Sequence, residues 1–307
     1  MQYAFNPLED AQKINRALYA KPKDTKLLIG VVCHRSNAQR QEILNAYFQY
    51  YNKNLMDELK DRLRGDFEEA MMTLFYSPVD FDCYHLNKAM KGLGTNEDTL
   101  IEILATRSNE RINQLKSRYI ELYRKDLVKT INSETSGFFR TVLLKLLEAN
   151  RSNNPCPDQK ECNDCAKRLY FSTQKKELLN DVFLYIFTQK SREELALIAQ
   201  VYFEWYQKTL FEVVKTYFSG DAQRILKAIV YALLSPSEYF AHRVNKAVKG
   251  LGTKDTMLIR ILVSRDEIDM ERIKRYYKQL YKKEMYDDVA NDVSGDYKIV
   301  LLDLIGK

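Results

Sequence analysis

The sequence of 307 residues predicts an all-α protein built from four related repeats. Its 10 glycines and 6 prolines are few for this length, and scarcity of helix breakers favours helix. The segment Asn87-Lys-Ala-Met-Lys-Gly-Leu-Gly-Thr95 returns as Asn245-Lys-Ala-Val-Lys-Gly-Leu-Gly-Thr253 with a single substitution. The sequence lacks sustained alternation of apolar and polar residues and lacks Asn-Gly and Asp-Gly turns, so neither strands nor hairpins are predicted. These observations together indicate helices arranged in repeats.

Two fainter copies of this unit appear once the register is set. An apolar triplet at spacing i, i+3, i+4 recurs in each copy, which places its members on one helix face. The four triplets are Leu28/Val31/Val32, Leu100/Ile103/Leu104, Phe183/Ile186/Phe187 and Leu258/Ile261/Leu262. A glycine precedes another apolar helix in each copy, at Gly65, Gly137, Gly220 and Gly295. Each unit of about 70 residues therefore predicts several short amphipathic helices that bury their stripes together as a small bundle.

The longest polar interruption runs from Asn150 to Asp164 and separates the second repeat from the third. It predicts an exposed linker that divides the chain into halves. The expected repeats are 1–77, 78–150, 166–236 and 237–307, with the linker at 151–165. Cys156, Cys162 and Cys165 fall in this linker, where exposed and oxidisable thiols are expected. Zinc binding is the alternative, although a structural zinc site usually needs four ligands at tighter paired spacing.

Composition excludes several classes of function. The 48 basic and 42 acidic side chains leave a formal net charge of +6, which suits an anionic membrane surface. The charges are interspersed without a basic block, so a nucleic-acid partner is not expected. No apolar run reaches about 18 residues, and the first six residues lack the features of a secretory signal, so an intracellular protein with free thiols is expected. No nucleophile–base pattern and no paired metal-binding histidines appear, so an enzyme is not expected.

The Gly-x-Gly-Thr loops, Lys91–Thr95 and Lys249–Thr253, within four repeats of about 70 residues resemble those of the annexins. The resemblance extends from about Leu8 to Ile305. The first and third repeats lack the motif and almost no tail precedes the first repeat, a pattern similar to the divergent protist α-giardins. The resemblance implies a curved disc of four five-helix repeats, with calcium sites on the convex face that bind phospholipid head groups.

The loop chemistry can also be judged from the residues. Calcium takes six to eight oxygen ligands, and a Gly-x-Gly turn can bend so that successive carbonyl groups converge, because glycine tolerates positive φ. An acidic residue follows each loop threonine at the same spacing, Glu134 after Thr95 and Asp292 after Thr253. Thr95 is also expected to cap the next helix, with Asp98 completing a capping box. The alternative interpretation is a tight turn between two helices with no ligand.

By the resemblance, calcium binds backbone carbonyls of the loop and the distant carboxylate in each of the two repeats. The implied ligands are Met90, Gly92, Gly94 and Glu134, and then Val248, Gly250, Gly252 and Asp292. The transfer of an exposed leucine from water into the membrane interface is favourable, and lysines are attracted to anionic lipid. The expected membrane contacts are Lys91, Leu93, Lys249 and Leu251.

The first and third repeats depart from the pattern at the acidic position, which holds Arg62 and Tyr217. Neither supplies a carboxylate, so neither repeat is expected to bind calcium. Their loops align with 20–23 and 175–178, where lysines are expected to be solvated; direct contact with lipid phosphates is the alternative.

The expected function is calcium-dependent binding to acidic phospholipid membranes, with calcium as the cofactor and cytoskeletal filaments as a second partner. The alternative is a calcium-independent structural repeat protein associated with the cytoskeleton. The expected location is cytoplasmic and peripheral, on the inner face of the plasma membrane, with the cytoskeleton or flagella as the alternative.

Overall fold

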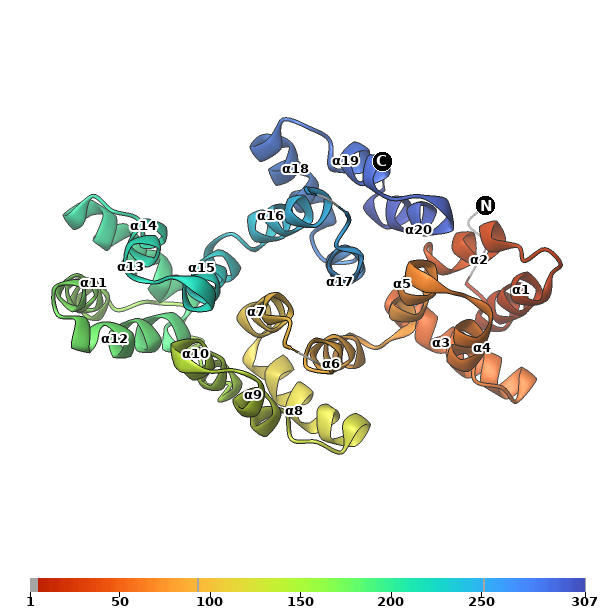
Figure 1. Cartoon of the computed structure of the whole chain (residues 1–307), viewed down its shortest axis with the longest axis horizontal. Coiled ribbons are helices and arrows are strands. Elements are labelled where there is room, and N and C mark those ends of the chain that lie inside the picture. The colour runs from red at the N-terminus through yellow and green to blue at the C-terminus, as the bar shows by residue number, and fades with distance from the viewer. Residues whose placement is uncertain (1–4, 93, 251, 307) are drawn as a thin grey trace. The chain divides into compact units, whose positions relative to one another are not determined.

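The chain folds into short helices. A computed structural model describes residues 5–92, 94–250 and 252–306, and these residues form twenty α-helices and no strand (Figure 1). The first repeat contains α1 (Pro7–Tyr19), α2 (Thr25–Val32), α3 (Asn37–Tyr51), α4 (Leu55–Arg62) and α5 (Gly65–Phe75). The second contains α6 (Pro78–Ala89), α7 (Glu97–Thr106), α8 (Asn109–Tyr123), α9 (Leu127–Glu134) and α10 (Gly137–Leu147). The third contains α11 (Gln159–Gln174), α12 (Lys176–Gln189), α13 (Arg192–Tyr206), α14 (Leu210–Tyr217) and α15 (Gly220–Leu234). The fourth contains α16 (Pro236–Val248), α17 (Asp255–Arg265), α18 (Met270–Tyr281), α19 (Met285–Asp292) and α20 (Gly295–Ile305). The prediction of an all-α fold with about five helices in each repeat is confirmed.

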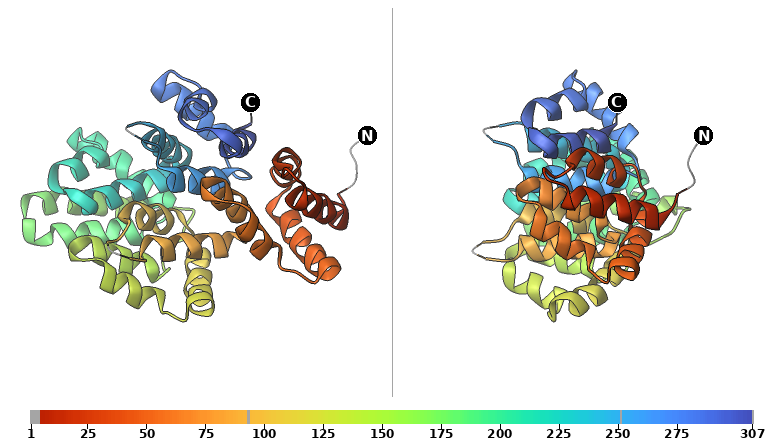
Figure 2. Two further views of the ribbon diagram at one scale, coloured as in Figure 1. Left: turned by 45° about the vertical axis from the view of Figure 1, so that its right-hand side comes forward. Right: turned by 90° about the vertical axis from the view of Figure 1, so that its right-hand side faces the viewer.

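Each repeat buries the apolar stripes that its sequence repeats. All twelve residues of the recurring triplets are buried, with Val31 the most accessible at 7%. A tyrosine in the third helix of each repeat is also buried, at Tyr47, Tyr119, Tyr202 and Tyr277. The two further views in Figure 2 show short helices that lie side by side in bundles. The helical periodicity therefore predicted the core residues of each bundle correctly.

The repeats associate in an order that differs from their order in the chain. One compact unit consists of residues 1–81 and 240–307, and the other of residues 82–239. Within the first unit, α5 packs against α17 and α20; within the second, α15 packs against α7 and α10. The first repeat is therefore paired with the fourth, and the second with the third. The prediction that the chain divides into halves between the second and third repeats is wrong.

The predicted linker is shorter and less exposed than expected. Helix α11 begins at Gln159, because the side chain of Asp158 caps it by accepting a hydrogen bond from the Glu161 amide. Cys162 and Cys165 lie on this helix and are 1% and 2% exposed, whereas Cys156 is exposed. The expectation of exposed thiols at Cys162 and Cys165 is therefore wrong. The polar stretch concealed the start of an amphipathic helix whose cysteines face the core.

The remainder of the linker is bound to both neighbouring repeats. The guanidinium of Arg151 donates to the carbonyl oxygens of Phe187 and Lys190 at 2.7 and 2.8 Å. The carbonyl oxygen of Arg151 accepts from the side-chain amide of Asn109 at 2.8 Å. Burial lowers the pKa of Arg151 to about 10. These contacts hold the segment against α8 and α12, so it joins the second and third repeats rather than separating them.

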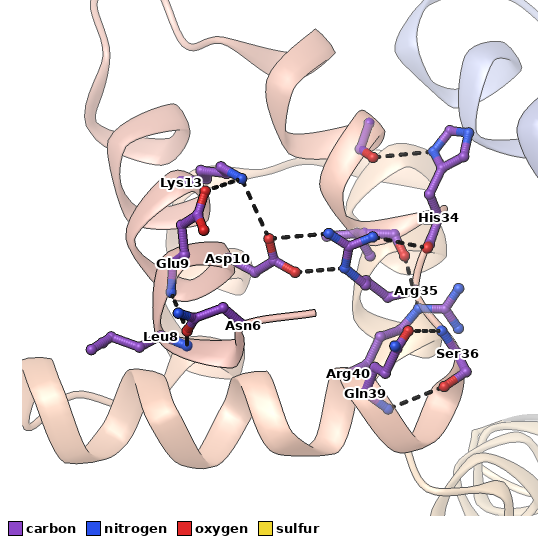
Figure 3. Close-up of polar contacts among 12 residues, drawn as sticks. Asn6, Leu8, Glu9, Asp10, Lys13, His34, Arg35, Ser36, Gln39 and Arg40 are labelled. Atoms are coloured by element: carbon purple, nitrogen blue, oxygen red, sulfur yellow. Dashed lines mark hydrogen bonds and ion pairs between the residues drawn. The ribbon is translucent and has the colours of Figure 1, made fainter. Parts of the chain in front are cut away.

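A buried acid–base pair recurs in the first two repeats. In the first, the guanidinium of Arg35 donates to both carboxylate oxygens of Asp10, which is 2% exposed (Figure 3). In the second, Arg107 donates to both oxygens of Asp82 at 2.8 Å, and Asp82 is 1% exposed. Bidentate pairing satisfies the carboxylate that burial removes from water. The pair fastens the first helix of each repeat to the end of the second.

The contact between the first and last repeats contains a carboxyl group with an unusual pKa. Asp266, which follows α17, lies 3.8 Å from Arg40 of α3. Burial raises the pKa of Asp266 to about 6, although the positive charge of Arg40 opposes the rise and Glu267 adds to it. An unfolded aspartate titrates near 4, so the folded chain binds the proton more tightly between about pH 4 and 6. The stabilising contribution is complete below about pH 4 and is lost as the pH rises through 6.

We expect Asp266→Asn to flatten this pH dependence. Relative to Asp266→Asn, the wild-type chain should lose about 1–3 kcal/mol of unfolding free energy between pH 4 and pH 7. Urea midpoints measured at several pH values for the two chains would reveal the difference. Asp61→Asn, an exposed substitution on α4, is the matched control and should follow the wild type. Parallel pH profiles for wild type and Asp266→Asn would contradict the prediction.

Candidate metal sites

The loop between α6 and α7 is bent at two glycines. Gly92 and Gly94 have φ angles of 101° and 86°, a region that other residues rarely adopt. A Cβ at either position would meet no atom within 4 Å, so these sites require glycine for its backbone conformation and not for space. The Asn96 amide donates to the Ala89 carbonyl oxygen at 2.8 Å and closes the loop. This is the bent main chain that the Gly-x-Gly motif predicted.

Glu134, at the end of α9, lies beside this loop. The Thr95 hydroxyl is 3.1 Å from the carboxylate oxygen Oε2 of Glu134 and 3.2 Å from its carbonyl oxygen. The Glu134 side chain is exposed. The structure thus brings together the loop and the acidic residue that the sequence separates by 39 positions.

The start of α7 differs from the expected capping box. Asn96 is the N-cap, and its side-chain oxygen accepts from the Thr99 amide at 3.1 Å. The Thr95 hydroxyl faces Glu134 instead, so the predicted capping role of Thr95 is wrong. Asp98 accepts from the guanidinium of Arg224 on α15 at 2.7 Å. Asparagine caps as well as threonine, and sequence alone could not place the cap within one residue.

The loop between α16 and α17 repeats the same construction. Gly250 and Gly252 have φ angles of 139° and 84°. The Lys254 amide donates to the Ala247 carbonyl oxygen at 3.0 Å, and the Thr253 hydroxyl donates to the carbonyl oxygen of Asp292 at 3.1 Å. Both contacts match those of the second repeat position for position.

A hollow of about 330 Å³ lies beside this second loop. It is lined by Val248 and Asp292, which the sequence indicated, and also by Asn245, Asp288 and Asn291, which it did not. Within the described residues, the Oδ2 atom of Asp292 is buried and has no hydrogen-bond partner. A buried carboxylate oxygen without a partner is costly unless a cation or water accompanies it. The signal for Asp288 was available, because it lies one helical turn before Asp292 on α19.

The available ligands favour a hard cation. In residues 5–92, 94–250 and 252–306, no three His, Cys, Asp or Glu side chains gather as a metal cluster. An ion at either loop must therefore be held mainly by peptide oxygens and one or two carboxylates. Calcium accepts such oxygen ligands, whereas structural zinc sites are built from cysteine and histidine. The residues present fit calcium.

The remaining predicted residues also lie at these loops where the structure describes them. Met90 is 8% exposed and Val248 is half-buried, so each could offer a main-chain carbonyl more readily than a side chain. Lys91 and Lys249 are exposed. Leu93 and Leu251, expected to enter the membrane, lie outside the described residues.

The first repeat has a lysine at the position where the second and fourth repeats have a threonine. The Lys23 ammonium donates to the carbonyl oxygen of Arg62, the residue at the acidic position. The Arg62 guanidinium lies 3.5 Å from the centre of the Tyr19 ring and donates to Glu58 at 3.0 Å. Two fixed positive charges thus lie at this position, which agrees with the expectation that this repeat does not bind calcium.

In the third repeat the loop is replaced by helix. Helix α11 ends at Gln174 and α12 begins at Lys176, so most of the segment aligned with the loop is helical. Tyr217, at the acidic position, is half-buried at the end of α14. Neither feature offers the bent backbone or the carboxylate of the other two loops.

The fold and the paired loops define the class as a four-repeat helical protein with two glycine-bent loops. The annexin family model matches four segments, residues 9–74, 81–146, 164–229 and 239–304. The chain therefore belongs to the annexin family, which is known for calcium-dependent phospholipid binding and is generally not enzymatic. None of the helices formed by the described residues is long and apolar enough to span a bilayer.

Individual relatives support this assignment. Bovine annexin A4 is 40% identical over 98% of this chain and 95% of its own length. Human annexin A11 is 37% identical over 98% of this chain, which spans only 60% of that longer relative. The solved structure of annexin III superposes with a TM-score of 0.95 at 38% identity, covering 99% of this chain and 95% of its own.

The α-giardins are among the structural neighbours. The calcium-bound α-14 giardin has a TM-score of 0.87 at 21% identity, covering 98% of this chain and 100% of its own. That level of identity shows a shared fold. The predicted membership of the annexin family is confirmed, and the annexins above share more of the sequence than this giardin does.

Proposed function

We propose that this chain binds acidic phospholipid membranes in a calcium-dependent manner through the loops of its second and fourth repeats, within repeats spanning 1–77, 78–150, 166–236 and 237–307. The observation that carries the proposal is the duplicated geometry of the two loops. In each, two glycines adopt positive φ and a threonine hydroxyl lies against the acidic residue 39 positions later. The first and third repeats have neither the two glycines nor the threonine beside an acidic residue.

The ligands in the second repeat would be the carbonyl oxygens of Met90, Gly92 and Gly94 with the carboxylate of Glu134. In the fourth repeat they would be the carbonyl oxygens of Val248, Gly250 and Gly252 with the carboxylate of Asp292. A site with so little negative charge binds calcium weakly in water, with a dissociation constant of roughly 10⁻⁴ M or weaker. Lipid phosphate oxygens can complete the coordination, so calcium and membrane each strengthen the binding of the other.

Side chains around the loops support the same orientation toward lipid. Lys91 and Lys249 are exposed next to the loops and would each contribute about 1 kcal/mol at an anionic surface. Leu93 and Leu251 would bury apolar surface in the interface. The formal net charge of +6 acts in the same direction.

This function places the protein in the cytoplasm, peripherally on the inner face of the plasma membrane. A second surface that binds cytoskeletal filaments would let it bridge membrane and filament. The rival function is calcium-independent association with cytoskeletal or flagellar filaments.

Cosedimentation of the full chain distinguishes these functions. With vesicles of phosphatidylserine that contain no phosphatidylcholine, the protein should pellet in the presence of calcium and remain in the supernatant with chelator. Vesicles of phosphatidylcholine alone should bring far less protein into the pellet, because they lack net negative charge. Filaments of tubulin, with and without chelator, form the third arm. Failure to pellet with phosphatidylserine vesicles at saturating calcium would refute the proposed function.

A further inference from the structure

The third repeat retains a hollow at the position where the fourth repeat has its candidate calcium site. The hollow has a volume of about 350 Å³, similar to that of the fourth repeat. Every residue that lines the fourth-repeat hollow has its counterpart, 75 positions earlier, in the lining of this one. The two hollows are therefore equivalent places in two copies of one bundle.

The chemistry of the third-repeat hollow is different. Tyr170 replaces Asn245, Val213 replaces Asp288 and Tyr217 replaces Asp292. Among the described residues, no carboxylate lines this hollow. Trp205 adds another aromatic ring to the lining. The substitutions remove the oxygen ligands and negative charge that calcium needs and replace them with aromatic rings.

Tyr170 is the most informative of these changes. In the other three repeats, the buried tyrosine of the third helix pairs its hydroxyl with an asparagine of the first helix: Tyr47 with Asn15, Tyr119 with Asn87, and Tyr277 with Asn245. In the third repeat, the asparagine position holds Tyr170. Its ring stacks on that of Tyr206, with centroids 4.0 Å apart and planes 4° from parallel. A stacked pair of aromatic rings therefore replaces the tyrosine–asparagine hydrogen bond of the other repeats.

The geometry of the rings selects the kind of ligand. Because Tyr170 and Tyr206 are in direct contact, no flat ring can insert between them, but both residues line the hollow. Trp205 already has the Lys167 ammonium 5.6 Å from its ring centre, so its ring accommodates a cation. Aromatic rings are the usual surroundings of a trimethylammonium group, which is bulky and weakly hydrated.

One lysine completes the arrangement. Lys208, which is exposed, also lines the hollow, together with the hydroxyl-bearing Thr173 and Thr216. A lone trimethylammonium ion would be repelled by this lysine, whereas a phosphocholine group would offer the lysine its phosphate. The combination of aromatic rings and the Lys208 ammonium group in the lining therefore matches a zwitterion.

We propose that the hollow of the third repeat binds the phosphocholine head group of phosphatidylcholine, with the trimethylammonium group against Tyr170, Trp205 and Tyr206 and the phosphate beside Lys208. The inference shares one premise with the proposed function, namely that this end of the repeats faces lipid. It gives the third repeat a calcium-independent lipid contact in place of the calcium site that it lacks.

Trp205 allows a direct test, because it is the only tryptophan in the sequence. Phosphocholine should be titrated into the full chain in the presence of chelator while Trp205 fluorescence is recorded. A saturable change is expected, and phosphoethanolamine should bind about tenfold more weakly because it lacks the methyl groups. No response to phosphocholine, or an equal response to both ligands, would overturn the assignment.

Variants locate the binding. Tyr170→Asn, which restores the residue of the other repeats, and Tyr206→Ala should each weaken phosphocholine binding about tenfold or more. Lys208→Gln should weaken binding of phosphocholine but not of choline. Tyr123→Ala, the position equivalent to Tyr206 in the second repeat, is the matched control and should leave binding unchanged. Equal effects of Tyr123→Ala and Tyr206→Ala would refute the location, and thermal unfolding verifies that each variant is folded.

Vesicles separate this proposal from the calcium function. Phosphatidylserine vesicles that also contain phosphatidylcholine should shift Trp205 emission in the wild type and not in Tyr170→Asn, at matched amounts of pelleted protein. A phosphocholine response without any vesicle response would overturn the lipid assignment. Calcium-dependent pelleting without a phosphocholine response would overturn the third-repeat site and leave the proposed function standing.

Discussion

Replacing Glu134 by glutamine and Asp292 by asparagine together should abolish calcium-dependent sedimentation with phosphatidylserine vesicles. Each substitution removes the carboxylate while keeping its size and its main-chain carbonyl. The other proposed ligands at each loop are neutral peptide oxygens, so the calcium concentration needed for half-maximal pelleting should rise on the order of 100-fold or more. Pelleting as a function of calcium, at fixed lipid and protein, measures the effect.

Two controls make the result specific. Glu121→Gln together with Asp303→Asn removes the same net charge from exposed positions on α8 and α20, which do not line the fourth-repeat hollow, and should leave the calcium dependence unchanged. Circular dichroism of the Glu134→Gln/Asp292→Asn chain should match the wild type. Unchanged pelleting by this variant at low calcium would show that the two loops are not the calcium sites.

The substitution Asp82→Ala should cause the largest loss of stability among single changes to charged residues. Asp82 is 1% exposed and accepts two hydrogen bonds from Arg107 at 2.8 Å. Its removal leaves the half-buried guanidinium of Arg107 without its carboxylate partner, and breaking a buried pair in this way typically costs about 3–5 kcal/mol. Chemical denaturation should show this loss as a lower midpoint for the unit that contains residues 82–239.

A second substitution tests the cause. Replacing Arg107 by methionine in the Asp82→Ala background removes the stranded charge, and should recover part of the lost stability. In the fourth repeat Phe240 stands at the position of Asp82, and the equivalent Arg265 pairs with Asp269 instead, at 2.7 Å. Asp181→Ala, on the exposed face of α12, should change stability by no more than about 0.5 kcal/mol. Equal losses for Asp82→Ala and Asp181→Ala would contradict the argument.

Much of the fold could be predicted because it is encoded locally and repeated. The spacing of Leu100, Ile103 and Leu104 specifies one helix face, and the same spacing in three other copies removes ambiguity. The glycines of the two loops could be expected at positive φ because few other residues tolerate it. The spacing from Thr95 to Glu134 and from Thr253 to Asp292 indicated two groups that meet in space, since one coincidence could be chance but two at the same distance could not.

Other features depend on partners that are distant in the sequence. Nothing near Asp98 indicates that it pairs with Arg224 on α15, and nothing near Asp82 indicates Arg107 as its partner unless the repeats are compared at equal positions. Cys162 and Cys165 lie in a polar stretch whose helical character depends on packing against the rest of the repeat. The aromatic hollow was missed because its rings come from three helices, and each tyrosine alone is indistinguishable from a core residue.

The association of the first repeat with the last has a consequence for how the chain is made. During synthesis α5, which ends at Phe75, leaves the ribosome 180 residues before α17 begins and 220 residues before α20 begins, and these are the helices that cover it. The apolar surface of α5 therefore stays uncovered until these helices are made. The second and third repeats are neighbours in the sequence and can pack together as soon as both have emerged. Nascent chains that stop before the last repeat should consequently expose α5 to chaperones, and the folding of residues 1–81 should be the final event.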